Sequence, residues 1–93
     1  MTQQCTTRVV LSNKHGLHAR PAHMWVQTAN AYASELRVGR VDGEKVDGKS
    51  IIGIMTLAAE HGAELELACE GPDCEDLLRA LVELVEAKFS EAE

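Results

Sequence analysis

The chain has 93 residues, which is enough for one domain. Nine basic residues stand against fifteen acidic ones, and the net charge of -6 argues against nucleic-acid binding, because a phosphate backbone requires clustered Lys and Arg. No apolar run approaches the roughly 18–20 residues that cross a bilayer, and the polar start over residues 1–7 is not a secretory signal. We therefore expect a single domain over residues 1–93, located in the cytoplasm, with neither nucleic acid nor a membrane as a partner.

The three cysteines are odd in number and form no CxxC pair, so neither a disulfide framework nor a zinc ribbon is indicated. We interpret Cys5, Cys69 and Cys74 as small buried or incidental thiols. The alternative is that Cys69 and Cys74 close a small loop or share a metal with a histidine. The core should be aliphatic, since the only aromatic residues are Trp25, Tyr32 and Phe89.

The first half of the chain predicts a strand, a helix and a hairpin. Residues 8–11 form a β-branched run, and a turn-like segment over residues 12–17 follows it. Apolar residues then recur at helical spacing from Ala19 onward, and the helix should fade between Asn30 and Ala33. Pro21 is tolerated there, because the first-turn N–H groups of a helix lack partners. Residues 36–41 predict a second strand, the Asp42-Gly43 pair predicts a tight turn with positive φ, and residues 44–46 predict a third strand.

The second half predicts a short helix, a strand and a long helix. Ser50 is placed to cap a helix from residue 51 to about residue 57. Residues 63–69 alternate between apolar and polar, which is typical of a half-buried antiparallel strand. Asp73 should cap the final helix, on which Leu77, Leu81 and Leu84 form one apolar stripe.

The element order is therefore βαββαβα. A strand with one polar face indicates a sheet covered on one side only. The sequence predicts an α+β open-faced sandwich, in which three helices cover one face of a four-stranded, mostly antiparallel sheet.

The chemistry of the chain is concentrated around His18. Gly16 allows a sharp turn out of the first strand, and His18 then falls at the N-cap position of the first helix. A helix N-terminus offers unpaired N–H groups and a partial positive charge, so a phosphoryl group on His18 would meet both, with Arg20 as a second positive charge. By spacing alone, two other readings remain: a solvated cap, or a metal cluster of His15, His18 and His23, which lacks carboxylate or thiol ligands at suitable spacing.

Two segments resemble a known family. The stretch Gly-Leu-His-Ala-Arg-Pro-Ala over residues 16–22 is similar to the phosphorylation-site motif of the HPr family, the histidine phosphocarriers of bacterial phosphotransferase systems. The stretch over residues 48–57 resembles the regulatory serine segment of that family. Both occur in the family's order and separation, and the predicted element order matches the family fold from about residue 6 to residue 89.

The resemblance implies that enzyme I, charged from phosphoenolpyruvate, phosphorylates His18 on Nδ1 and that a IIA-type protein accepts the phosphoryl group. Arg20 corresponds to the active-site arginine of the family. Ser50 corresponds to the serine that an HPr kinase/phosphorylase modifies in many bacteria. The chain would be a monomeric carrier that needs no cofactor and no metal, rather than a stand-alone enzyme.

The residues around Ser50 predict two further features. By its position alone Ser50 is a plain N-cap, and a phosphate there would add about −2 of charge without unfolding the helix. The segment after it carries more apolar residues than one buried stripe can hold. We expect some of them to be exposed beside His18 as a docking surface for partners. Ile51, Ile52 and Met55 are the candidates.

One departure from the family pattern concerns the first helix. After Arg20 it carries His23, Gln27 and Asn30 where sugar-system carriers commonly present basic residues to enzyme I. Charge complementarity sets encounter rates, so this helix favours a regulatory or nitrogen-related branch, similar to NPr. Three functional hypotheses stand: a phosphocarrier, a regulatory docking module that acts through the Ser50 face, and a metal-binding domain. The role of His15, as a hydrogen-bond partner of the phosphate or as part of the turn only, is left open.

Overall fold

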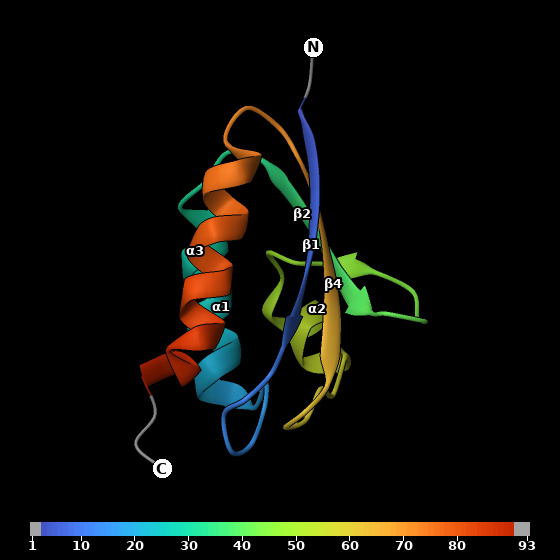
Figure 1. The fold of residues 1–93 in the computed structure, drawn as a ribbon, viewed down its shortest axis with the longest axis vertical. Coiled ribbons are helices and arrows are strands. Elements are labelled where there is room, and N and C mark those ends of the chain that lie inside the picture. Colours follow the sequence, from blue (N-terminus) through green and yellow to red (C-terminus); the bar gives the residue numbers. More distant parts are fainter. Residues whose placement is uncertain (1–2, 91–93) are drawn as a thin grey trace.

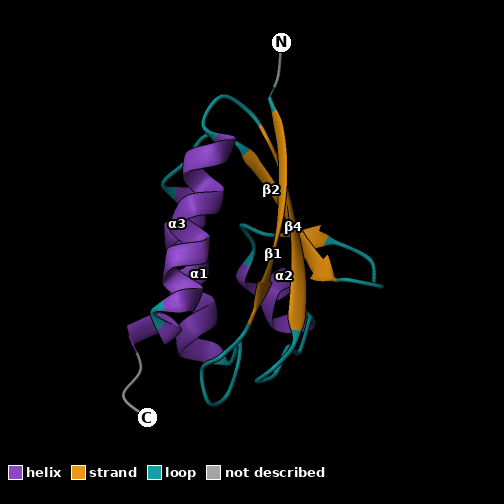
Figure 2. Cartoon of the chain, viewed as in Figure 1, coloured by secondary structure: helices purple, strands orange, loops and turns teal. Residues whose placement is uncertain are grey.

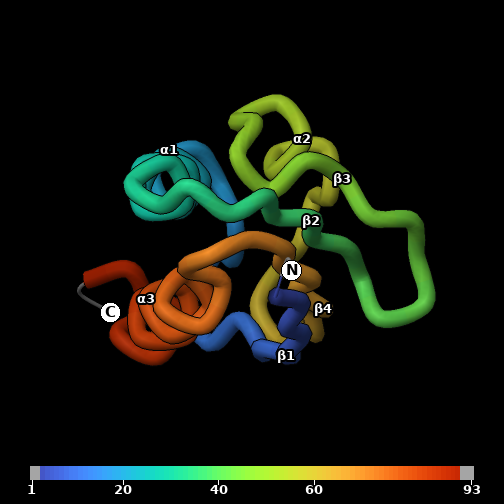
Figure 3. Tube along the Cα trace, turned by 90° about the horizontal axis from the view of Figure 1, so that it is seen from above, coloured from blue at the N-terminus to red at the C-terminus, as the bar shows by residue number. Residues whose placement is uncertain are grey.

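The computed structural model describes residues 3–90 and has the predicted element order. Its strands are β1 (Gln4–Val10), β2 (Glu35–Arg40), β3 (Val46–Asp47) and β4 (Glu64–Glu70), and its helices are α1 (Ala19–Asn30), α2 (Ile51–Thr56) and α3 (Cys74–Glu86). The strands form one sheet in the order β1-β4-β2-β3, and every neighbouring pair is antiparallel. Figures 1 and 3 show α1 and α3 packed together on one side of this sheet, with α2 beside α1. The predicted open-faced sandwich is confirmed.

Figure 2 shows the sheet and the helices as two layers, and the buried apolar residues form one core cluster. Leu65 and Leu67 of β4 and Leu77 and Leu81 of α3 are fully buried in it. Trp25 of α1 is fully buried. No helix within residues 3–90 is long and apolar enough to cross a bilayer.

The first strand is longer than its sequence predicts. It begins at Gln4, four residues before the predicted start, and pairs with β4 residue by residue from Gln4 opposite Glu70 to Val10 opposite Glu64. Gln4 and Thr6 at its start are exposed on the open face of the sheet. A strand of an open-faced sheet tolerates polar residues there, so a search for apolar runs misses them.

The predicted hairpin after β2 is wrong in its detail. The strand β3 has two residues, Val46 and Asp47, and the Gly43 N–H donates to the Arg40 carbonyl oxygen (2.9 Å) without a positive φ at Gly43. The loop bends over Gly39, where an added Cβ would lie 2.5 Å from the Glu44 carbonyl oxygen. Residues 41–45 lie outside the ladder, which begins with Val38 opposite Val46.

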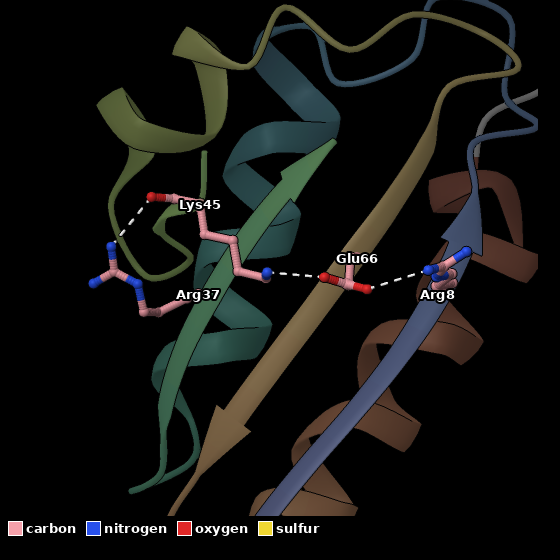
Figure 4. A network of polar contacts seen from close by, with 4 residues as sticks. All are labelled: Arg8, Arg37, Lys45 and Glu66. Atoms are coloured by element: carbon pink, nitrogen blue, oxygen red, sulfur yellow. Dashed lines mark hydrogen bonds and ion pairs between the residues drawn. The ribbon is translucent and has the colours of Figure 1, made fainter. Parts of the chain in front are cut away.

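The open face of the sheet carries a polar network instead of a second layer of helices. Glu66 lies between two cations, with Lys45 Nζ 2.8 Å from Oε1 and Arg8 Nη2 3.5 Å from Oε2 (Figure 4). Arg37 donates to the Lys45 carbonyl oxygen (3.1 Å). The hydrogen bond from Lys45 contributes most to a lowered pKa of Glu66. The network joins β1, β4 and the loop after β2.

Asp73 occupies the predicted N-cap position of α3, but its carboxylate does not cap that helix. It accepts hydrogen bonds from the Ala33 and Ser34 backbone N–H groups (2.9 Å each) and from the Ser34 hydroxyl, while the Ser34 Oγ accepts from the Asp73 N–H (3.1 Å). The expected capping bond is therefore wrong. The carboxylate instead ties the start of α3 to the start of β2.

These bonds predict an acid-dependent loss of stability. The Ser34 hydroxyl, then the Ala33 N–H, hold the pKa of Asp73 below its usual value of 3.8. A carboxylate with a lowered folded-state pKa stabilises the fold above the unfolded-state pKa, and that contribution is lost as the pH falls through the folded-state pKa. We expect Asp73→Asn to lower the Tm at pH 7, and the difference from wild type to shrink below about pH 4. Thermal unfolding followed across pH measures it.

Asp76→Asn is the matched control, because Asp76 is exposed in the same helical turn and pairs only with Arg79 (3.3 Å) among the described residues. A surface pair of this kind contributes little. Equal Tm values for Asp73→Asn and Asp76→Asn at pH 7 would contradict the proposed anchoring.

Candidate functional site

The loop between β1 and α1 is held in place by backbone contacts. The buried Asn13 donates through Nδ2 to the Gly16 carbonyl oxygen (2.7 Å), and the Leu17 N–H donates to the Ala59 carbonyl oxygen (2.9 Å). Gly16 has a φ of +64°, and an added Cβ would collide with Ala59 O and lie 2.7 Å from the Cα of Glu60. The loop that precedes His18 is therefore seated on the segment that follows α2.

His18 is the N-cap residue of α1, as predicted. Its backbone is extended (φ −75°, ψ −174°), its carbonyl oxygen accepts the Ala22 N–H (2.9 Å), and its side chain makes no capping bond to its own helix. The imidazole is partly exposed. The first-turn N–H groups of a helix have no i−4 partners, so α1 offers donors and a partial positive charge beside the ring. This arrangement can stabilise an anionic group carried on the ring.

Arg20 lies in the first turn of α1 and is exposed. Within residues 3–90 its guanidinium takes part in no ion pair or hydrogen bond with another side chain. Pro21, which follows it, is buried and has no N–H to leave unsatisfied. The chain therefore keeps an exposed cation two residues after His18.

His15 is the neighbour of His18 that the sequence left unassigned. The two ring centroids are 5.5 Å apart, with an interplanar angle of 88°, so the edge of one ring meets the face of the other. The spacing of two histidines around Gly16 and Leu17 was the only signal for this contact. His23 is exposed farther along α1, and no group of three or more His, Cys, Asp or Glu residues within the described part of the chain could hold a metal ion.

Ser50 is the N-cap of α2, which confirms the predicted cap. Its Oγ accepts the Gly53 N–H (3.2 Å). The residues before it are tied to α1 and to the turn after it: Trp25 Nε1 donates to the Gly48 carbonyl oxygen (3.2 Å), and Lys49 Nζ donates to the Tyr32 carbonyl oxygen (2.6 Å). These bonds, which no local pattern predicts, place the start of α2 against α1.

The apolar residues of α2 divide into a buried and an exposed set. Ile54 is fully buried in the core. Ile51, Ile52 and Met55 are exposed by 37%, 76% and 46%, and we call these three residues the apolar patch. The expected exposure of part of this helix is confirmed, whereas its use as a docking surface stays a prediction.

Comparison with known proteins agrees with this geometry. A family model described as the PTS HPr component phosphorylation site matches residues 5–87. The phosphocarrier protein HPr of Pseudomonas aeruginosa is 46% identical over 85 residues, which cover 91% of this chain and 94% of that one. The crystal structure of HPr from Thermoanaerobacter tengcongensis superposes with a TM-score of 0.91 at 44% identity, covering 96% of this chain and 99% of that one.

The HPr-like protein Crh of Halalkalibacterium halodurans is also similar, with 42% identity over 79 residues that cover 85% of this chain and 93% of that one. The fold and these matches thus define a phosphotransfer carrier of the phosphotransferase system. The chain belongs to the HPr family. Its partners are components of the same system.

The contact at Gly16 generates a prediction with an internal control. Gly16→Ala should lower the free energy of unfolding by about 3 kcal/mol, because positive φ costs a side chain about 1–2 kcal/mol and a collision with backbone adds about as much. Gly62 also has a positive φ (+88°), but open space surrounds its Cβ position, so Gly62→Ala should cost only about 1–2 kcal/mol. Urea unfolding of both variants measures the difference, and equal losses would show that the loop does not need this close approach.

Proposed function

We propose that His18 accepts a phosphoryl group from phosphorylated enzyme I, which is charged from phosphoenolpyruvate, and passes it to a IIA-type protein in the cytoplasm. The observation that carries the proposal is the position of His18: a partly exposed imidazole at the N-terminus of α1 that does not cap its own helix. Family membership supports the carrier role. The acceptor atom and the two partners come from the family resemblance.

In the proposed step, Nδ1 of His18 attacks the phosphorus atom of phosphorylated enzyme I. The new P–N bond forms on His18 while the bond to the enzyme I side chain breaks, and the phosphoryl group leaves toward the acceptor by the same chemistry. Such transfers depend on positioning and on stabilising charge over the equatorial oxygens of the phosphoryl group. The N–H groups of the first turn and the Arg20 guanidinium can supply that charge.

Phosphorylation of His18 is tested by intact-mass analysis after incubation with enzyme I, magnesium and phosphoenolpyruvate. We expect wild type to gain one phosphoryl group that is lost on acid quench, and His18→Ala to gain none. His15→Ala is the matched control, because its ring lies 5.5 Å away and presents the same chemistry. In the same assay Arg20→Ala should react at least roughly tenfold more slowly, as expected for one lost charge-assisted hydrogen bond. A phosphoryl group retained on His18→Ala would overturn the assignment.

The apolar patch is the proposed docking surface for partners. It lies on α2, whose following segment supports the His18 loop through the Leu17–Ala59 hydrogen bond. Exposed apolar side chains on so small a molecule favour a contact with another protein. After Arg20, the exposed polar residues of α1 are His23, Gln27 and Asn30, so encounter with enzyme I does not depend on further Lys or Arg side chains of this helix. This charge pattern favours a regulatory, nitrogen-related branch of the family.

Ser50 is the proposed site of regulation by an HPr kinase/phosphorylase. Its phosphate would sit at the N-terminus of α2 beside the apolar patch, in a chain of net charge -6. About −2 of added charge would repel an acidic partner while leaving the cap intact. Phosphorylation of Ser50 would thereby reduce transfer through His18.

Comparing Ser50→Asp with Ser50→Asn separates the effect of negative charge from the effect of capping. Asp and Asn are both good N-cap residues, but only Asp is charged. We expect similar Tm values for the two variants and a Kd for enzyme I that is raised roughly three- to tenfold in Ser50→Asp alone, less so at high salt. Calorimetric titration of each variant with enzyme I at two ionic strengths measures the Kd. Equal Kd values would exclude regulation by charge.

A regulatory docking module of the same fold is the second candidate function. The apolar patch and the Ser50 cap on one helix favour it, as does the 42% identity to the Crh protein of Halalkalibacterium halodurans. The presence of His18 in the matched motif argues for the carrier instead. Failure of His18 to accept a phosphoryl group would shift the assignment to this module.

A further inference from the structure

The three cysteines lie together at one end of the core, on three different elements. Cys5 of β1 is directly opposite Cys69 of β4 in the sheet register, and Cys74 is the first residue of α3. Cys69 and Cys74 are buried, and Cys5 is half-buried. Figure 1 shows that the start of β1 and the start of α3 lie at one end of the molecule, and the loop before α1 lies at the opposite end.

Two of these thiols are already in contact. The Sγ atoms of Cys5 and Cys74 are 2.7 Å apart, although the residues are 69 positions apart in the sequence. A disulfide bond is about 2.05 Å long, so the sulfur atoms need to approach by only about 0.7 Å. All three cysteines are free in this structure.

We propose that Cys5 and Cys74 form an oxidisable dithiol, which closes to an intramolecular disulfide by exchange with a low-molecular-weight disulfide such as oxidised glutathione. Cys69 takes no part in the bond. The site is independent of the proposed phosphorylation of His18.

The exchange consumes one molecule of oxidised glutathione for each protein disulfide that forms. The half-buried Cys5 attacks one sulfur of oxidised glutathione, which forms a mixed disulfide and releases one glutathione thiolate. Cys74 then attacks Cys5 Sγ and displaces the second glutathione. The two cysteines lose two electrons and two protons, and oxidised glutathione is reduced to two thiols.

The surroundings of the pair make this reaction slow at neutral pH. The hydrogen bond with Cys74, burial, and the charge of Glu75 raise the pKa of Cys5 to about 11. Cys69, the thiol that faces Cys5 from β4, has a pKa raised to about 11, mainly by burial. Only the thiolate attacks, so the rate should rise roughly tenfold per pH unit between pH 7 and 9. The dithiol therefore responds to sustained oxidation rather than to brief exposure.

The bond would fasten an edge strand to a helix. The sheet order leaves β1 paired only with β4, and the disulfide would tie its start to the start of α3. Cross-linking residues so distant in sequence restricts the unfolded chain strongly. Oxidation should raise the Tm on the order of 10 °C. His18 lies beyond the other end of β1, so phosphoryl acceptance should be unchanged.

The test incubates reduced wild type with oxidised glutathione at about pH 8.5, where exchange is not limited by protonation as strongly as at pH 7. Intact mass, thiol titration under denaturing conditions and peptide mapping then read the product. We expect a monomer that has lost two thiols, a linked peptide pair containing Cys5 and Cys74, one remaining thiol at Cys69, and the higher Tm. A thiol reductant should reverse all of these changes.

Cys69→Ser is the matched control and should still form the bond, whereas Cys5→Ser and Cys74→Ser should not gain the Tm increase. A Cys5–Cys69 peptide in wild type, a stable glutathione adduct on Cys5, or loss of the bond in a folded Cys69→Ser variant would each overturn the proposal. The peptide map of the wild-type protein identifies the paired cysteines without any variant. The proposal can therefore be tested even if a variant fails to fold.

Discussion

A backbone contact between two loops sets the geometry of the end of the molecule that carries His18. Gly16 approaches the Ala59 carbonyl group so closely that no side chain fits, and the Leu17 N–H donates to the same oxygen. The chain after β1 is thereby seated on the chain after α2, and α1 begins directly after His18. His18, the first turn of α1 and the helix that Ser50 caps are consequently parts of one packed unit.

The two ends of the sheet carry different chemistry. His18, with Arg20 and its helix N-terminus, lies at the end where β1 stops, and the thiols lie at the end where β1 starts (Figure 1). At the first end His18 is partly exposed and Arg20 is exposed, whereas at the other Cys69 and Cys74 are buried. A change at the thiol end is expected to alter the stability of the fold, while transfer and docking are the functions proposed for the His18 end. The length of the sheet separates the His18 site from the thiols, so the two sites are not in direct contact.

Patterns with a local cause were predictable from the sequence. The period of the apolar residues gave the helices, because each helix buries a stripe against one layer. The Ser50 cap was predictable because a serine hydroxyl and the N–H three residues on need nothing but their own helix. Features that depend on contacts between distant segments were not predictable from the sequence. The first four residues of β1 are strand because β4 pairs with them, and Asp73 bonds to Ser34 because two N–H groups at the start of β2 offer it a better site than its own helix.

The sequence by itself determined the fold class, the family and the identity of the candidate acceptor, since helix period, strand alternation and the motif around His18 are written in neighbouring residues. Only the tertiary structure decided which residues meet across long separations. It set the edge-to-face contact of His15 with His18, the exposure of Ile52 and the approach of Cys5 to Cys74. Sequence patterns report how a residue relates to its own helix or strand. Contacts between elements depend on how two faces pack, and the excluded volume at Gly16 and the register of β1 on β4 settle that packing.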